Sequence, residues 1–197
     1  MTKQQKQFIT DIYKLCKQYG RAYDNICPIA VTAQAVNESR WGQSLLARDY
    51  HNYFGLKASS TWQGKTAKLK TKEEYKKGHL VTVYATFRAF DDMPQGVEGY
   101  YKFINTKRYA NLKNLSDPLQ YLTNIRQDGY ATSYTYVQNV YQTVVSIKNY
   151  LTALDVIDGE WGNGEERKLR LTMKGYDYRT VQNIVNEIVR ESNVLDV

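Results

Sequence analysis

The chain has few of the residues that build covalent or metal-held scaffolds. It contains only two cysteines, two histidines and three prolines in 197 residues. Cys16 and Cys27 allow at most one disulfide, and together with His51 and His79 they show no spacing typical of a metal site. We therefore predict no metal and no other cofactor. We expect both cysteines to be free thiols; a disulfide between them is the less favoured alternative in a cytoplasmic product.

Long apolar runs are also missing. No stretch is long enough to span a bilayer, and residues 1–7 lack the apolar core of a signal peptide. These absences predict a protein that does not insert into membranes and is made in the cytoplasm. The alternative is an exported enzyme whose signal peptide has been removed.

Charge is distributed unevenly. Residues 1–154 hold 21 Lys and Arg against 11 Asp and Glu, a net charge of +10, whereas residues 155–197 hold 6 against 9, a net charge of −3. A basic segment suits an anionic polymer. Nucleic acid is one such polymer, but no helix-turn-helix, zinc-finger or basic aromatic RNA motif is present. We therefore expect no nucleic-acid partner.

The hydrophobic pattern predicts a mainly α fold with a small β-hairpin, formally α+β. Apolar residues at helical spacing predict helices near 3–19, 28–38, 42–48, 93–105, 118–127 and 136–157. Val81, Val83 and Ala85 alternate with polar neighbours, which predicts a strand. We predict two domains, 1–154 and 155–197, from the separate motifs of the C-terminal segment described below; the net charge changes sign across the same boundary.

One carboxylic acid ends an apolar helix. Val31, Gln34, Ala35 and Glu38 share one helix face, and the first and third of these predict that the face is buried. Burial disfavours the anion, so the pKa of Glu38 should rise, as a general acid requires. The alternative is a surface glutamate in the last turn of the helix, paired with Arg40.

Five motifs resemble those of one family, in the same order. Residues 38–42 read Glu-Ser-Arg-Trp-Gly, and residues 52–57 read Asn-Tyr-Phe-Gly-Leu-Lys. Together with 62–64, 87–90 and 129–136, they resemble the family 73 glycoside hydrolases, the bacterial and phage N-acetylglucosaminidases that cut peptidoglycan. Phe90 stands where the family has Tyr, and Ser133-Tyr134 where it has Asp-Pro. The resemblance covers roughly 5–152 and implies a lysozyme-like helical domain with a small β-hairpin lobe.

The same resemblance implies the catalytic groups. The family's acid maps onto Glu38, and its active-site tyrosine onto Tyr130, with Tyr136 a weaker candidate. A second carboxylate, just before a tyrosine, maps best onto Glu74. Glu73 is the alternative, because neighbours in a strand point to opposite faces. The competing interpretation of this segment is a solvated, charged hairpin.

Sugars bind through ring faces and hydroxyl groups, so aromatic and amide side chains near these motifs are candidate contacts. The predicted substrate-binding residues are Asn52, Tyr53, Phe54, Trp62, Glu73, Tyr134 and Tyr136. Trp41 is a further aromatic candidate, more typical of a core residue than of a groove wall.

The implied reaction is hydrolysis of the β-1,4 bond between N-acetylglucosamine and N-acetylmuramic acid in peptidoglycan glycan strands. Either Glu74 activates a water with inversion, or the substrate's acetamido oxygen attacks with retention. A muramidase or a lytic transglycosylase on the same scaffold is the first alternative. A non-catalytic wall-binding or virion structural protein is the second.

The C-terminal segment has its own motifs. Residues 159–167 and 175–178 look like the Cpl-seven-type cell-wall-binding repeat of phage lysins, which implies a three-helix bundle. Arg167 occupies the motif's arginine and is the candidate wall contact; the alternative is an i,i+4 surface partner on a helix. The combination resembles a phage endolysin, made in the host cytoplasm to act on the cell wall. The oligomeric state is not predicted.

Overall fold

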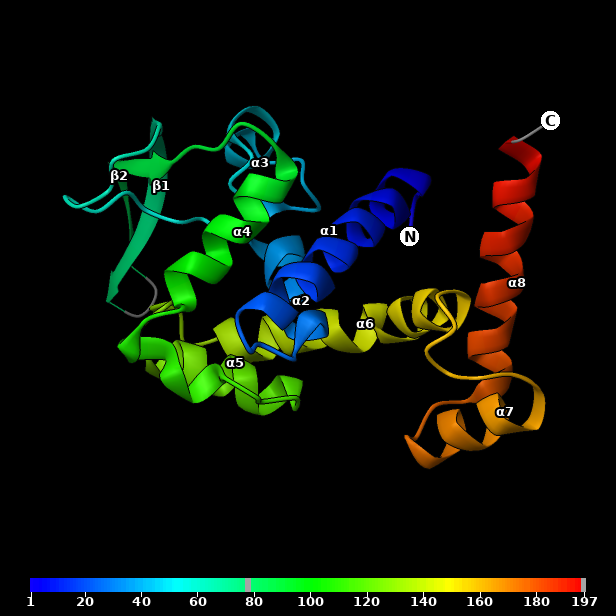
Figure 1. Cartoon of the computed structure of the whole chain (residues 1–197). Coiled ribbons are helices and arrows are strands. Elements are labelled where there is room, and N and C mark those ends of the chain that lie inside the picture. Colours follow the sequence, from blue (N-terminus) through cyan, green and yellow to red (C-terminus); the bar gives the residue numbers. More distant parts are fainter. Residues whose placement is uncertain (77–78, 196–197) are drawn as a thin grey trace. The chain divides into compact units, whose positions relative to one another are not determined.

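Figure 1 shows the computed structural model of the chain. It describes the backbone of residues 1–76 and 79–195 and the side chains of residues 1–71 and 81–193. The chain forms two compact units, Met1–Val144 and Val145–Val197. Both this division and the predicted one after residue 154 fall inside helix α6 (Tyr136–Ile157). The boundary between the two units therefore lies within a continuous helix, and no loop or linker sequence marks it.

The first unit is mainly helical, as predicted. Its elements are α1 (Lys3–Ala22), α2 (Pro28–Ser39), α3 (Leu45–Tyr50), β1 (Thr66–Lys76), β2 (His79–Arg88), α4 (Met93–Ile104), the 3-10 helix η1 (Lys107–Leu112), α5 (Pro118–Gln127) and the start of α6. Five of the six predicted helices are confirmed within a few residues. The 3-10 helix was not predicted.

The helix predicted over 42–48 is wrong in its start. Arg40, Trp41 and Gly42 have φ angles of 52°, 60° and 76°, all in the left-handed region. A right-handed helix cannot run through such residues, so α3 begins only at Leu45, with the Ser44 side chain accepting from Ala47 N.

The helices pack around an apolar core. Helix α1 packs on α2 and α4, and α2 packs on α5 (Figure 1). Cys16 is fully buried in this core and, like Cys27, is a free cysteine, as predicted. Burial raises the pKa of each thiol to about 12, so both stay protonated and unreactive near neutral pH.

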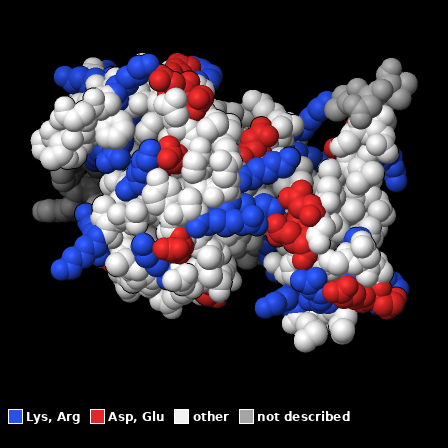
Figure 2. Space-filling view, in the orientation of Figure 1, with Lys and Arg blue, Asp and Glu red and all other residues white. Residues whose placement is uncertain are grey.

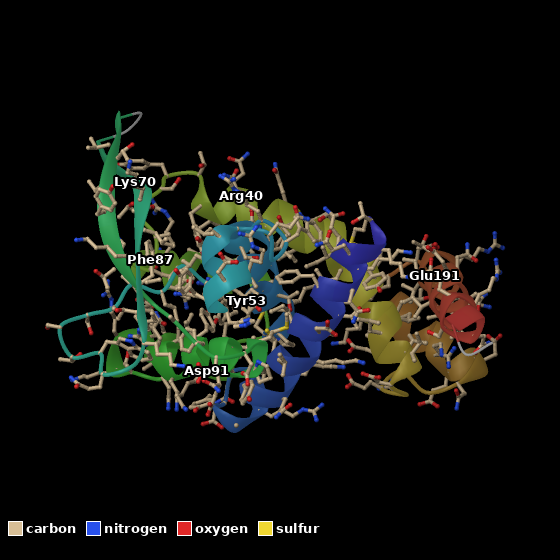
Figure 3. All side chains as sticks on the ribbon, turned by 90° about the horizontal axis from the view of Figure 1, so that it is seen from above. Arg40, Tyr53, Lys70, Phe87, Asp91 and Glu191 are labelled. Carbon is tan, nitrogen blue, oxygen red and sulfur yellow. The ribbon has the colours of Figure 1, made fainter. Side chains whose placement is uncertain are left out.

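The two strands form the predicted antiparallel hairpin. Ala67 pairs with Phe87 and Lys70 with Tyr84. Because side chains alternate across a strand, Ala67 and Phe87 lie on one face and are buried, whereas Lys70 and Tyr84 belong to the other face and are exposed. Figure 3 labels Lys70 and Phe87 on the hairpin. Figure 2 shows how Lys and Arg side chains spread over the visible face of the molecule.

Asn52 ties the loop after α3 to the end of β2. Its side chain is 1% exposed. Its Nδ2 donates to the carbonyl oxygens of Leu56 (2.9 Å) and Arg88 (2.8 Å), and its Oδ1 accepts from Leu56 N (3.0 Å). One side chain thus closes the 52–56 turn and fastens it to the hairpin.

The second unit is a three-helix arrangement, as expected from the repeat. It consists of the end of α6, α7 (Gly164–Met173) and α8 (Tyr178–Leu195). Its buried cluster contains Ala153, Val156, Leu171, Val181 and Val185. Trp161 is partly buried and packs against this cluster. Among the described residues, no helix combines the length and hydrophobicity needed to cross a membrane.

We predict that Asn52→Ala lowers the free energy of unfolding by about 2–4 kcal/mol, because it removes the three hydrogen bonds that this buried side chain makes to the backbone of Leu56 and Arg88. Urea denaturation measures this change. Asn111→Ala is the matched control: Asn111 is exposed, its side chain makes one long hydrogen bond of 3.4 Å, and we expect a change within about 0.5 kcal/mol. Equal losses in the two variants would contradict the role assigned to Asn52.

Candidate active site

Glu38 lies in the last turn of α2. Val31, Gln34 and Ala35, on the same helix face, have no solvent exposure, as predicted. Glu38 departs from the expectation of a buried side chain, because it is exposed. The alternative pairing with Arg40 is also absent: within the described residues, Glu38 makes no ion pair or hydrogen bond.

The pKa of Glu38 is raised from its usual 4.5 to about 7, and desolvation by the surrounding protein is the cause. Side-chain exposure and desolvation are compatible if water reaches the carboxyl from one side while protein surrounds the others. No donor or cation among the described residues offsets this cost of charging the group. The predicted direction of the shift is therefore confirmed, and the acid is substantially protonated near neutral pH.

A strained turn follows Glu38 directly. The Ser39 hydroxyl donates to Ala35 O (2.5 Å) and accepts from Gly42 N (2.7 Å). The left-handed conformation of Arg40 and Trp41 costs roughly 1–2 kcal/mol per residue. At Gly42 a Cβ atom would lie 2.7 Å from the Phe8 ring, so only glycine fits. This turn fixes the point where α2 stops, one residue beyond the acid.

The loop containing residues 52–57 lies against the carboxyl group. Gly55 has a φ of 65°, and a Cβ atom there would be 3.4 Å from Glu38 Oε2. Next to it, Phe54 is buried and stacks on Tyr100 with ring centroids 4.2 Å apart. The Tyr130 hydroxyl donates to Phe54 O (2.7 Å). The motif thus brings backbone, rather than a polar side chain, to the acid.

Tyr130 and Tyr136 complete the surroundings of Glu38. Their ring centroids are 6.1 Å apart. Burial raises the pKa of both hydroxyls well above the usual value, and for each the charge on Glu38 adds to the increase. The structure therefore brings together Glu38, Tyr130 and Tyr136, three residues that the sequence singled out.

Three of the predicted sugar-binding residues are buried inside the protein. Asn52, Tyr53 and Phe54 are 1%, 4% and 2% exposed. The Tyr53 hydroxyl bonds His51 Nδ1 (2.9 Å), and burial raises the pKa of Tyr53 to about 12. Figure 3 shows Tyr53 among the helices. In this conformation the three side chains hold the loop and offer no ring face to a sugar.

The other aromatic candidates are more accessible. Tyr134 is 67% exposed, with the Arg126 guanidinium 5.7 Å from its ring centroid. Trp62 and Trp41 are half-buried. The guanidinium of Arg88 lies 4.5 Å from the Trp62 ring centroid, so one face of this indole is already covered. Tyr134 therefore keeps the most open surface for stacking.

Glu73 and Glu74 lie on β1, where their backbones pair with Val81 and Leu80. Their side chains are outside the described residues. The assignment of either as the second carboxylate stays a prediction.

In the second unit, Arg167 bonds within its own fold. Its guanidinium donates to Gly162 O (3.1 Å), Asn163 Oδ1 (3.0 Å) and Gln182 Oε1 (3.1 Å). These bonds fasten the start of α7 to α8. Asn163 is four residues before Arg167, so the contact matches the alternative of an i,i+4 partner, and wall contact by Arg167 stays a prediction.

Two surface hollows have linings that do not include the acid. One, of about 520 Å³, is lined by Asp49, Tyr50, His51, Lys65, Thr66, Ala89, Phe90 and Asp91. The other, of about 620 Å³, is lined by Lys3, Gln4, Gln7, Phe8, Asp11, Trp41, Gly42, Ala47, Arg48, Tyr53 and Met93. Figure 3 labels Asp91, which belongs to the lining of the first, and Tyr53, which belongs to the lining of the second. Glu38 lines neither hollow.

Only one group of acids in the described residues is close enough to share a cation. Asp155, Asp158 and Glu160 have carboxylate oxygens within 4.8 Å of one another. Exposed acids commonly gather in this way without a metal, so we assign none.

Comparison with known proteins identifies relatives of both units. Residues 13–149 match the glucosaminidase family model, described as mannosyl-glycoprotein endo-β-N-acetylglucosaminidase, and residues 152–189 match the CW_7 repeat. Peptidoglycan hydrolase FlgJ of Pseudomonas aeruginosa is 32% identical over 126 residues, covering 61% of this chain and 31% of that protein. A probable N-acetylmuramidase of Lactococcus lactis subsp. cremoris is 33% identical over 111 residues, covering 56% of this chain and 24% of that protein.

The fold has solved counterparts. A peptidoglycan hydrolase mutant from Sphingomonas sp. A1 superposes with a TM-score of 0.64 at 23% identity, covering 85% of this chain and 99% of that one. The chain spans less than a third of the length of the two curated relatives. The first family model, however, matches well over half of the chain, including all the residues gathered around Glu38. The chain therefore belongs to the glucosaminidase family.

Proposed function

We propose that this protein is an endo-β-N-acetylglucosaminidase that hydrolyses the bond between N-acetylglucosamine and N-acetylmuramic acid in peptidoglycan. The observation that carries the proposal is the Glu38 carboxyl, whose pKa of about 7 lets it hold a proton near neutral pH. Membership of the glucosaminidase family and the name of the FlgJ relative support the choice of substrate.

In this mechanism Glu38 protonates the glycosidic oxygen as the bond to the anomeric carbon breaks. Positive charge then develops on the sugar, and a water completes the hydrolysis. If Glu74, or Glu73 in its place, activates that water directly, configuration inverts and the two carboxyl groups should lie roughly 6.5–9.5 Å apart. If the acetamido oxygen attacks first, configuration is retained. The anomeric form of the first product distinguishes the two routes.

The second unit is proposed to bind the wall. The CW_7 match supports this role for residues 152–189. The Arg167 guanidinium has five N–H groups and bonds three groups of its own unit, so its remaining N–H groups could donate to the wall without breaking those bonds. Synthesis in a phage-infected host stays a prediction.

A muramidase is the second candidate function, and the name of the Lactococcus relative favours it. It would use the same acid on the alternate bond of the strand. A lytic transglycosylase and a non-catalytic wall-binding protein are the further alternatives, and product chemistry separates all four.

We predict that Glu38→Gln lowers peptidoglycan hydrolysis by about 10²–10⁴-fold, because the amide cannot donate the proton that the leaving oxygen requires. Mass spectrometry of digested cell walls measures the products. The wild type should release fragments with N-acetylglucosamine at the reducing end.

Glu98→Gln is the control for that experiment and should leave activity unchanged. Glu98 is a half-buried carboxylate on α4 that pairs with Lys102 and accepts from the Tyr23 hydroxyl. In the described part of the chain, it bonds none of the residues gathered around Glu38. Reducing muramic acid would identify a muramidase, and 1,6-anhydro ends a transglycosylase. Full activity of Glu38→Gln would refute the proposed acid.

We further predict a pH dependence of stability. The pKa of Glu38 is higher in the folded than in the unfolded chain, so the folded state binds more protons between about pH 4.5 and 7. Its contribution to stability is therefore complete below pH 4.5 and is lost as pH rises through 7. Glu38→Gln should melt at a higher temperature than the wild type at pH 8 and at a similar one at pH 4. A constant difference between the melting temperatures would contradict the raised pKa.

A further inference from the structure

A line of buried polar side chains crosses the core of the first unit and ends at the helix face that carries Glu38. Its members are Asn25, Tyr121, Tyr100, Gln34 and Tyr136, and none is more than 7% exposed. They come from five segments: the loop before α2, then α5, α4, α2 and the first residue of α6. Because a buried polar group without a partner is costly, this line must satisfy its members mutually.

We call this line of five side chains the relay. A backbone amide sets the direction in which its hydrogen bonds are donated. Cys27 N–H can only donate, and it donates to Asn25 Oδ1 (3.4 Å). The Nδ2 of Asn25 therefore faces the Tyr121 hydroxyl, 3.1 Å away. Tyr121 accepts that bond, and its own proton goes to the Tyr100 oxygen at 2.9 Å. The Tyr100 proton then goes to Gln34 Oε1 at 2.7 Å.

Gln34 passes this direction to Tyr136. With its oxygen engaged by Tyr100, its Nε2 donates to the Tyr136 oxygen over 2.6 Å. Tyr136 is the acceptor in this bond, so its own hydroxyl proton must point elsewhere. Among the residues that the structure describes, that proton has no acceptor. Within that part of the chain, it is the one hydroxyl proton of the relay that is not donated to the protein.

The spare proton lies beside the acid. Gln34 and Glu38 are four residues apart on α2 and share a face, so the phenol held by Gln34 lies along that face. Tyr130, whose ring is 6.1 Å from that of Tyr136, bonds the carbonyl of Phe54. The next residue is Gly55, where a Cβ atom would lie 3.4 Å from Glu38 Oε2. After burial, the Glu38 charge is the largest contribution to the raised pKa of Tyr136.

We propose that Gln34 is a positioning residue: through the one-way relay it holds Tyr136 as a hydrogen-bond donor to an oxygen of the N-acetylhexosamine ring bound beside Glu38. The inference rests on the proposed function, because that function places the sugar there. No proton is transferred along the relay. It only determines that the Tyr136 hydroxyl donates toward the substrate and accepts from the protein.

The first test is a double-mutant cycle. Gln34→Met keeps the length of the side chain and removes its hydrogen bonds, and Tyr136→Phe removes the hydroxyl. We expect each to lower kcat/KM about tenfold. The double variant should lose no more than Tyr136→Phe alone, because Gln34 acts through that hydroxyl. Additive losses would overturn the inference. Thr32→Val, at a fully buried α2 position outside the relay, is the matched control and should retain activity.

Gln34→Glu tests the direction of the relay. An ionised carboxylate can only accept, so it would draw the Tyr136 proton away from the sugar, whereas the protonated form can donate as the amide does. Burial among Tyr100, Tyr121, Tyr130, Tyr136 and Glu38 should raise the pKa of the new carboxyl. The ratio of its kcat to that of the wild type should therefore increase at least fivefold from pH 8 to pH 5. A constant ratio would contradict the assigned direction.

Circular dichroism melting verifies that each variant is folded. Should Gln34→Met not fold, Tyr100→Phe replaces it, since it removes the bond to Gln34 Oε1 and keeps the ring; we expect a twofold to fivefold loss in kcat/KM, and no loss would overturn the inference.

Calorimetric binding of an N-acetylglucosamine trimer separates this inference from the proposed function, because it needs no hydrolysis. Weaker binding by Gln34→Met and Tyr136→Phe supports the relay even if the wild type cleaves no wall. Binding that is unchanged or absent in every variant overturns the relay.

Discussion

The site depends on the cost of charging one carboxyl group where protein displaces most of its water. Glu38 gains this environment from its place at the end of α2, next to the turn at Gly55 and beside the phenols of Tyr130 and Tyr136. No cation or donor among the described residues offsets the cost, so the proton is retained near neutral pH. The residues discussed below either fix the backbone beside Glu38 or surround it with uncharged groups.

The surrounding core is polar but electrically neutral. A cationic partner near Glu38 would lower its pKa and remove the proton that the reaction needs. Tyrosine and amide side chains satisfy one another by hydrogen bonds without bringing charge, and burial raises the pKa of Tyr100, Tyr121 and Tyr136, so they stay neutral as well. The abundance of tyrosine in this unit therefore has a physical use beyond filling space.

Rigidity on either side of the acid has local causes. The left-handed turn at Arg40 and Trp41 ends α2 directly after Glu38, and the Ser39 hydroxyl secures it. On the other side of the acid, the Asn52 side chain secures the loop that carries Gly55 by hydrogen bonds to the backbone. In both places a buried side chain fixes the backbone by hydrogen bonds. The strained conformation of Arg40 and Trp41 persists only because the surrounding structure holds it.

The sequence by itself determined the helix positions, the hairpin, the free cysteines, the family and the raised pKa of Glu38, because hydrophobic period, capping residues and motif order are local signals. It placed the start of α3 wrongly, since a left-handed turn at Arg40 and Trp41 has no clear local signature. Only the tertiary structure decided that Tyr53 and Phe54 are buried, that Arg167 bonds within its own unit, and that Gln34 links Tyr100 to Tyr136. Those outcomes depend on tertiary contacts between residues that are distant in the sequence, and hydrophobic periodicity carries no information about such contacts.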